Sequence, residues 1–354
     1  MITERDLKGL LEAGIVDEAT ADSIRAYEGA AHADRPRFDF INATYYFGAL
    51  VVMLAFTWLL FDWYDRYGGI ALMALASSYA VLFVLGGDWL WKQRGLRIPA
   101  GLLFTLAVCM VPIGVLGFQD YMGWFPVGNA FEIENEAARL AFLRQLQTYQ
   151  AWIAAATVLV GVGAITLRRF AFMAVPPVLG FTACWALMVE ILNGGDAGDQ
   201  VMSTHLMLAG FFVMAVGFVV DRRTKEDFAF WLYGLGLAHF WFGMIGRLFS
   251  APGEPGELAW GIFAFVNLLL FDISILLQRK VFMVGGAVGI MAYLGHLGFE
   301  TFENVLLFPF ALTFVGLAIM GAAVLYRKNE AKLEQLVMSL LPAGFKKWLP
   351  SSRG

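Results

Sequence analysis

The stretch at 293–305, YLGHLGFETFENV, places a histidine and two glutamates at the end of an apolar run. His296 and Glu300 are four residues apart, so a helix would carry both on one face. A histidine beside a carboxylate can bind a divalent metal or relay protons, because imidazole changes charge near neutral pH. The sequence therefore allows three hypotheses for His296: a metal ligand, a proton relay, or only a polar residue at the end of a membrane helix.

Other ionisable side chains are expected near the same membrane face. His205 begins an apolar run, while Arg247 and Glu190 lie near the ends of two others. The predicted outer-face polar cluster consists of His205, His296, Glu300, Arg247 and Glu190. A metal site would use His296 with His239 or His205, although no H-E-x-x-H spacing is present. The alternative for each histidine is a hydrogen bond to a helix or a position at headgroup level.

A second set of polar side chains lies inside apolar runs and is the predicted substrate or ion pathway: Asp272, Asn267, His239 and Asp88. An ionisable group inside a membrane span costs several kcal/mol unless it is satisfied, so each is a functional candidate. The structural alternatives are ion pairs: Asp88 with Lys92 one turn further on, and Asp272 with Arg279 or Lys280 reaching back. No catalytic residue is predicted.

The elements that position these residues are membrane helices. Hydrophobic residues make up 59% of the 354 residues and charged residues 15%, with a mean hydropathy of +0.67. A membrane-spanning helix needs about 20 mostly apolar residues. We predict an all-α polytopic membrane helix bundle of about ten transmembrane helices with a small N-terminal cytoplasmic helical hairpin. The predicted spans are 41–61, 69–91, 98–118, 149–167, 170–192, 203–220, 228–249, 258–278, 281–299 and 305–326.

Charge predicts the orientation of these spans. Lysine and arginine accumulate in cytoplasmic loops. The basic segments all fall on one side of the predicted membrane: RPR at 35–37, KQRGLR at 92–97, RR at 168–169, DRRTK at 221–225, QRK at 278–280 and YRKNEAK at 326–332. The loops of the other side are mainly acidic. Both termini are therefore predicted to be cytoplasmic.

Three predicted domains follow: a hairpin and linker at 1–34, the transmembrane domain at 35–327 with an outer amphipathic segment at 119–148, and an interfacial cytoplasmic tail at 328–354. In the hairpin, Gly14 ends the first helix and Asp17 caps the second. So small a unit cannot bury enough surface alone. Residues 1–28 are therefore expected to dock on the membrane domain, on a second copy in a homo-oligomer, or on a protein partner.

Two further patterns bear on the bundle. Basic turns with phenylalanine recur as RRFAFM at 168, KEDFAFW at 225 and RKVFM at 279, which favours stacked helical hairpins unless they are common interfacial features. Prolines at 112, 176, 177 and 309 are candidates for broken helices, since proline removes a backbone donor. The two cysteines, Cys109 and Cys184, have no disulfide or zinc spacing.

The opening of the chain resembles a known family. Leu7, Leu11, AGIV at 13–16 and Tyr27 precede a linker and YYFGALVVMLAFTWLLFDWYDRYG, a combination similar to bacterial membrane proteins of the domain-of-unknown-function 2157 family. The resemblance covers about the first seventy residues. It implies a multi-pass protein of the bacterial inner membrane, and it brings no catalytic residues.

Three functions remain open. Ten spans, interrupted helices and buried polar residues favour a transporter or permeation protein for a small solute or ion. The alternative is a non-catalytic sensor or assembly protein that recruits a partner through the hairpin. A membrane enzyme with an outward-facing metal site ranks last, because no Ser/His/Asp order, Walker loop or dinucleotide glycine pattern is present. No cofactor is expected. The lipid bilayer is an expected partner, whereas nucleic acid is not, because the sequence has no basic face interleaved with aromatic residues.

Overall fold

The computed structural model describes residues 14–24, 40–126, 128, 130–224, 226–250 and 256–297, with the single positions 7, 10, 11, 313 and 317. This part of the chain is helical and contains no β-strand. The elements are α3 (Phe40–Trp89), η1 (Leu90–Arg94), α4 (Arg97–Tyr121), η2 (Ala130–Glu132), α5 (Glu136–Leu167), η3 (Ala171–Ala174), α6 (Val175–Leu192), α7 (Asp199–Arg223), α8 (Phe228–Phe249), α9 (Glu257–Leu277) and α10 (Lys280–His296).

Seven of the helices are long and apolar enough to cross a membrane. The first and ninth predicted spans correspond to two shorter apolar helices, Ala43–Ala55 and Lys280–His296. The tenth predicted span, 305–326, and the tail at 328–354 lie outside the described residues. The described part of the chain is thus all-helical and has the helices of a multi-pass membrane protein, and the number of ten spans stays a prediction.

The element α3 is two helices joined by a sharp turn at Gly68. Its φ of 67° and ψ of −172° lie in a region that is accessible mainly to glycine. The amide of Gly69 donates to a carboxylate oxygen of Asp120 at 2.8 Å, which ties this turn to the end of α4. The separation of the first two predicted spans is therefore made by one glycine.

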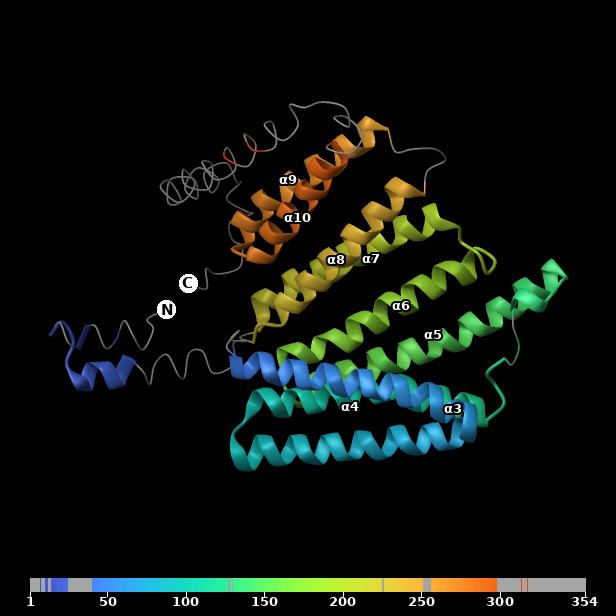
Figure 1. Ribbon diagram of the computed structural model, residues 1–354, viewed down its shortest axis with the longest axis horizontal. Coiled ribbons are helices and arrows are strands. Elements are labelled where there is room, and N and C mark those ends of the chain that lie inside the picture. Colours follow the sequence, from blue (N-terminus) through green and yellow to red (C-terminus); the bar gives the residue numbers. More distant parts are fainter. Residues whose placement is uncertain are drawn as a thin grey trace.

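Consecutive helices pack against each other as antiparallel hairpins, and the hairpins stack in chain order (Figure 1). Close approach is possible where glycines face a neighbouring backbone. A Cβ on Gly210 of α7 would lie 2.3 Å from the backbone nitrogen of Phe240 and 2.5 Å from the carbonyl oxygen of Gly236, both in α8. Such small-residue contacts drive helix association in membranes, where apolar burial contributes little. The stacked hairpins predicted from the repeated basic turns fit this arrangement.

The two ends of the bundle differ in charge. At one end, here the basic end, the turns contain Arg94, Arg97, Arg168, Arg169, Arg222, Arg223, Arg279 and Lys280. At the opposite, acidic end, α4 leads to α5, α6 to α7 and α8 to α9, with Asp120, Glu190, Asp199 and Glu257. Between these ends many large apolar side chains face outward, among them Leu159 (74% exposed) and Phe211 (63%). An apolar exterior fits a lipid surrounding.

The segment predicted as a separate amphipathic helix on the outer surface differs in the structure. From Glu136 onward it forms the first turns of α5, which runs without a break to Leu167. Neither glycine nor proline occurs between 136 and 160, so nothing interrupts the helix. The side chain of Asn135 caps α5 by accepting the amide of Ala138 at 3.1 Å.

In the N-terminal segment the structure has the predicted helix stop and cap. Gly14 has a φ of +65°, and the amides of Gly14 and Ile15 donate to the carbonyls of Leu11 and Leu10 at 3.0 Å, which is a Schellman motif. The Asp17 carboxylate accepts the amide of Thr20 at 2.9 Å, and hydrogen bonds from the side chain and the amide of Thr20 lower the pKa of Asp17. The cap is therefore present above the ordinary aspartate pKa and weakens as the pH falls through the lowered one.

Candidate functional site

Two apolar grooves open on the surface of the bundle, on the two sides of the α5–α6 hairpin. The first cavity, of about 560 Å³, lies between α4, α5 and α6. The second cavity, of about 580 Å³, lies between α5, α6, α7 and α8. Along α5 the first cavity is lined from Gln150 to Thr157, and the second from Val158 to Thr166. The first cavity is thus nearer the acidic end and the second reaches the basic end.

A close contact between α5 and α6 separates the two cavities. A Cβ on Gly161 would lie 2.9 Å from Cδ of Pro177, and one on Gly180 would lie 3.0 Å from the carbonyl oxygen of Ala154. Pro176 lines the first cavity and Pro177 the second. Both prolines stand in the first turn of α6, so they begin this helix and do not break it. Pro112, inside α4, lines the first cavity, and Pro309 lies outside the described residues.

Ion pairs connect the turns at the basic end. Asp88 accepts hydrogen bonds from Lys92 and from Arg168, both at 2.8 Å. The predicted pair of Asp88 with Lys92 is confirmed, and Arg168 adds a link from the end of α3 to the turn between α5 and α6. Arg169 lies 3.8 Å from Glu226, which precedes α8. The pairs of Arg168 with Asp88 and of Arg169 with Glu226 therefore link neighbouring hairpins at the basic end.

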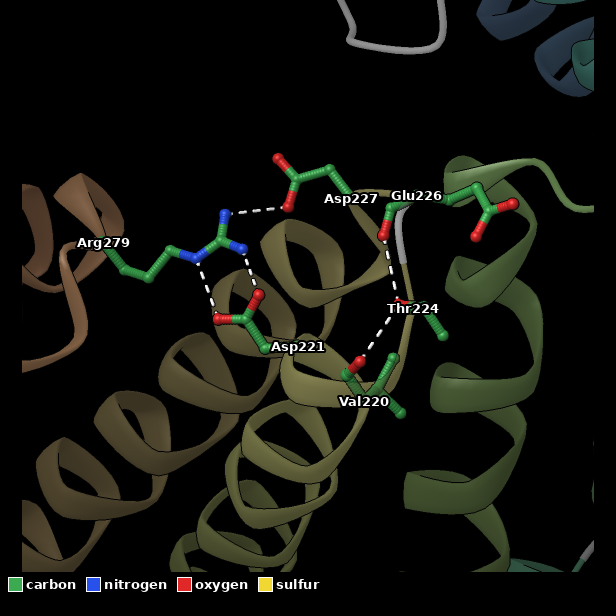
Figure 2. A network of polar contacts seen from close by, with 6 residues as sticks. All are labelled: Val220, Asp221, Thr224, Glu226, Asp227 and Arg279. Carbon is green, nitrogen blue, oxygen red and sulfur yellow. Dashed lines mark hydrogen bonds and ion pairs between the residues drawn. The ribbon is translucent and has the colours of Figure 1, made fainter. Parts of the chain in front are cut away.

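The most buried ion pairs join α7, α8 and α10 (Figure 2). The guanidinium of Arg279 donates through Nε and Nη2 to both oxygens of Asp221, and through Nη1 to Asp227 at 2.8 Å. The Asp221 side chain is 1% exposed and that of Arg279 is 17% exposed. Burial by itself would lower the pKa of Arg279, but the hydrogen bond to Asp221 and the charges of Asp227 and Asp221 outweigh it and raise this pKa. The arginine stays charged.

Arg279 therefore does not reach back to Asp272. The sequence allowed Arg279 or Lys280 as the partner of Asp272, and the structure gives Arg279 other partners. Asp272 is exposed on the surface of α9, whereas the guanidinium of Arg279 donates to Asp221 of α7 and to Asp227, which precedes α8. Asp221 and Asp227 were not among the predicted site residues. Their signal in the sequence was weak: Asp221 stands in the basic segment DRRTK, and nothing local marks its partner 58 residues away.

The other predicted pathway residues do not line either cavity. Asn267 is completely buried, where it accepts the Trp241 indole at 3.1 Å and donates to the carbonyl of Phe263 at 2.8 Å. The Nδ1 atom of His239 lies 2.6 Å from the carbonyl of Leu235, one turn earlier in α8. Asn267 and His239 are thus engaged within the helix packing.

The described members of the outer-face cluster lie on different helix pairs. Glu190 accepts a hydrogen bond of 2.5 Å from Gln147, and Arg247 donates to Gln200 at 3.2 Å. His205 of α7 lies beside Trp185 of α6, with ring centroids 6.4 Å apart. His296 stacks on Trp260 at 4.0 Å and lies 3.7 Å from Glu257. Glu300 lies outside the described residues.

The described part of the chain contains no group of side chains at this cluster that could hold a metal ion. There, no group of three His, Cys, Asp or Glu side chains is close enough to hold a metal ion. Among the described residues, Glu257 is an acid that lies close to His296.

Comparison with protein-family models, with curated proteins and with solved structures found no match to this chain. The resemblance of the first seventy residues to the family of unknown function stays a proposal.

Proposed function

We propose that this chain is a multi-pass protein of the bacterial inner membrane that transports an apolar or amphipathic solute. The supporting observation is the pair of cavities on the two sides of the α5–α6 contact, one nearer each end of these helices. Their walls are mainly valine, leucine, isoleucine, alanine and proline, so water and hydrated ions are poor ligands for them. The sequence favours transport of a small solute or ion, and among these substrates the apolar walls favour a lipid-like molecule.

The α5–α6 contact is the proposed barrier. Gly161 against Pro177 and Gly180 against Ala154 leave no room between the helices. Sliding or parting of α5 and α6 at this contact would connect the two cavities, and small sliding motions of packed helices are a common form of conformational change. The solute would then cross the bundle along apolar walls.

The proposed orientation places the basic end in the cytoplasm. Arginine and lysine gather in the turns of that end, and acidic residues gather in the turns of the other. By the positive-inside rule, the second cavity then opens toward the inner leaflet and the first toward the outer leaflet.

Reconstitution tests the proposed transport. The full chain is placed in liposomes with a phosphatidylcholine that carries a fluorescent label on one acyl chain, and a membrane-impermeant reductant then bleaches the outer leaflet. With the protein, we expect the label of both leaflets to be bleached. In vesicles without protein only the outer label is lost. Equal bleaching of the two samples would refute transport of this class of solute.

An Asp272→Asn variant separates the proposed route from the polar pathway predicted at first. Asp272 is exposed on α9 and lines neither cavity, so we expect lipid flux to stay within about twofold of the wild type. Loss of flux in a variant with an unchanged melting temperature would instead place the route along α9.

Deletion of residues 1–34 separates transport from the alternative of an assembly protein. If the membrane domain transports alone, the deleted protein keeps its flux in liposomes. A partner of residues 1–28 and a homo-oligomer remain predictions, and loss of flux on deletion would show that the N-terminal segment is part of the transport unit.

A further inference from the structure

The second cavity has one apolar part and one charged end. Within the helices its walls include Val162 (51% exposed), Phe212 (49%) and Val216 (37%). These side chains face outward along an open groove, where the acyl chains of the bilayer surround them. A groove of about 580 Å³ with such walls accommodates an extended hydrocarbon chain.

The basic end of the same cavity carries positive charge. Arg169, beyond the last turn of α5, and Arg223, at the end of α7, both line it. The Arg169 side chain is 72% exposed, and its contact with Glu226 is long at 3.8 Å. No acidic side chain in the described part of the chain forms an ion pair with Arg223. The residues that line the cavity include these two arginines and no carboxylate, so this end of the cavity carries positive charge.

An apolar groove that ends in two arginines is complementary to an anionic amphiphile. We infer that the second cavity binds an anionic phospholipid, with an acyl chain along Val162 and Val216 and the phosphate between Arg169 and Arg223. Guanidinium groups bind phosphate oxygens with paired hydrogen bonds. In the proposed orientation, the basic end lies near the headgroups of the inner leaflet. As a statement about the substrate class, this inference rests on the proposed function.

Native mass spectrometry of the detergent-purified full chain tests the site. The probes are phosphatidylglycerol and phosphatidylcholine with identical acyl chains. We expect a preference for phosphatidylglycerol, and roughly fivefold weaker binding for each arginine removed. An Arg169→Gln, Arg223→Gln double variant should therefore lose most of the preference. The matched control is Arg222→Gln, because Arg222 is equally a surface residue at the end of α7 but lies over the Phe218 ring and does not line the cavity.

The apolar half of the site has its own pair of variants. Val216→Trp fills the groove and should reduce binding of both lipids. Leu159→Trp, at a 74% exposed position outside both cavities, should not. Displacement of the lipid by millimolar inorganic phosphate alone would reveal a plain anion site and overturn the inference.

The outcomes for this inference and for the proposed function are distinct. Equal binding of the two lipids, or a preference that survives the double substitution, overturns the anionic lipid site even if labelled phosphatidylcholine is transported. A preference that depends on both arginines, without flux of any labelled lipid, supports the binding site and refutes transport.

Discussion

Replacing Arg279 by methionine is expected to lower the free energy of unfolding by about 3–5 kcal/mol, because it leaves two carboxylates close together without their cation. The Asp221 side chain is 1% exposed, and Arg279 supplies three of its donors to Asp221 and Asp227. Methionine keeps much of the length and apolar stem of the side chain, so the loss measures the missing charge and hydrogen bonds. Thermal unfolding in detergent should show a melting temperature several degrees lower.

The matched control for this variant is Arg169→Gln. Arg169 is also a basic-end arginine with an acidic neighbour, but it is 72% exposed and 3.8 Å from Glu226, so its removal should cost about 0–1 kcal/mol. Adding Asp221→Asn and Asp227→Asn to Arg279→Met should recover part of the stability, since no uncompensated charge then remains. Equal melting temperatures for Arg279→Met and the wild type would contradict the role given to these ion pairs.

The substitutions Ala183→Trp and Val162→Trp are each expected to reduce lipid flux to the rate of protein-free vesicles. Ala183 lines the first cavity and Val162 the second, and both are exposed in the grooves, so the larger ring fills the cavity without entering the helix contacts. Either substitution alone should suffice, because the proposed route passes through both cavities.

The control for both substitutions is again Leu159→Trp, because Leu159 is an exposed residue of α5 that lines neither cavity. All three variants should keep the melting temperature of the wild type. Flux that continues in the Ala183→Trp and Val162→Trp variants would show that the solute does not pass through these cavities, and the α5–α6 contact would then be packing alone.

Features that depend on neighbouring residues were predictable from the sequence. The helix stop at Gly14 and the cap at Asp17 depend on backbone geometry within a few residues. The pair of Asp88 and Lys92 follows from a spacing of one helical turn. The end of the predicted amphipathic segment could not be predicted in this way. Its pattern describes one face of a helix and does not say where the helix ends, and from Glu136 onward the segment is part of α5.

The sequence by itself determined that this is an apolar, all-helical chain with its basic residues in alternate turns, because hydrophobic length and loop charge are properties of each segment alone. Only the tertiary structure decided which helix faces meet. Asn267 and Asp272 lie five residues apart, about 140° around one helix, so α9 buries the first and exposes the second. The cavities and the contacts of Arg279 likewise come from segments far apart in the chain, and local patterns carry no information about such pairings.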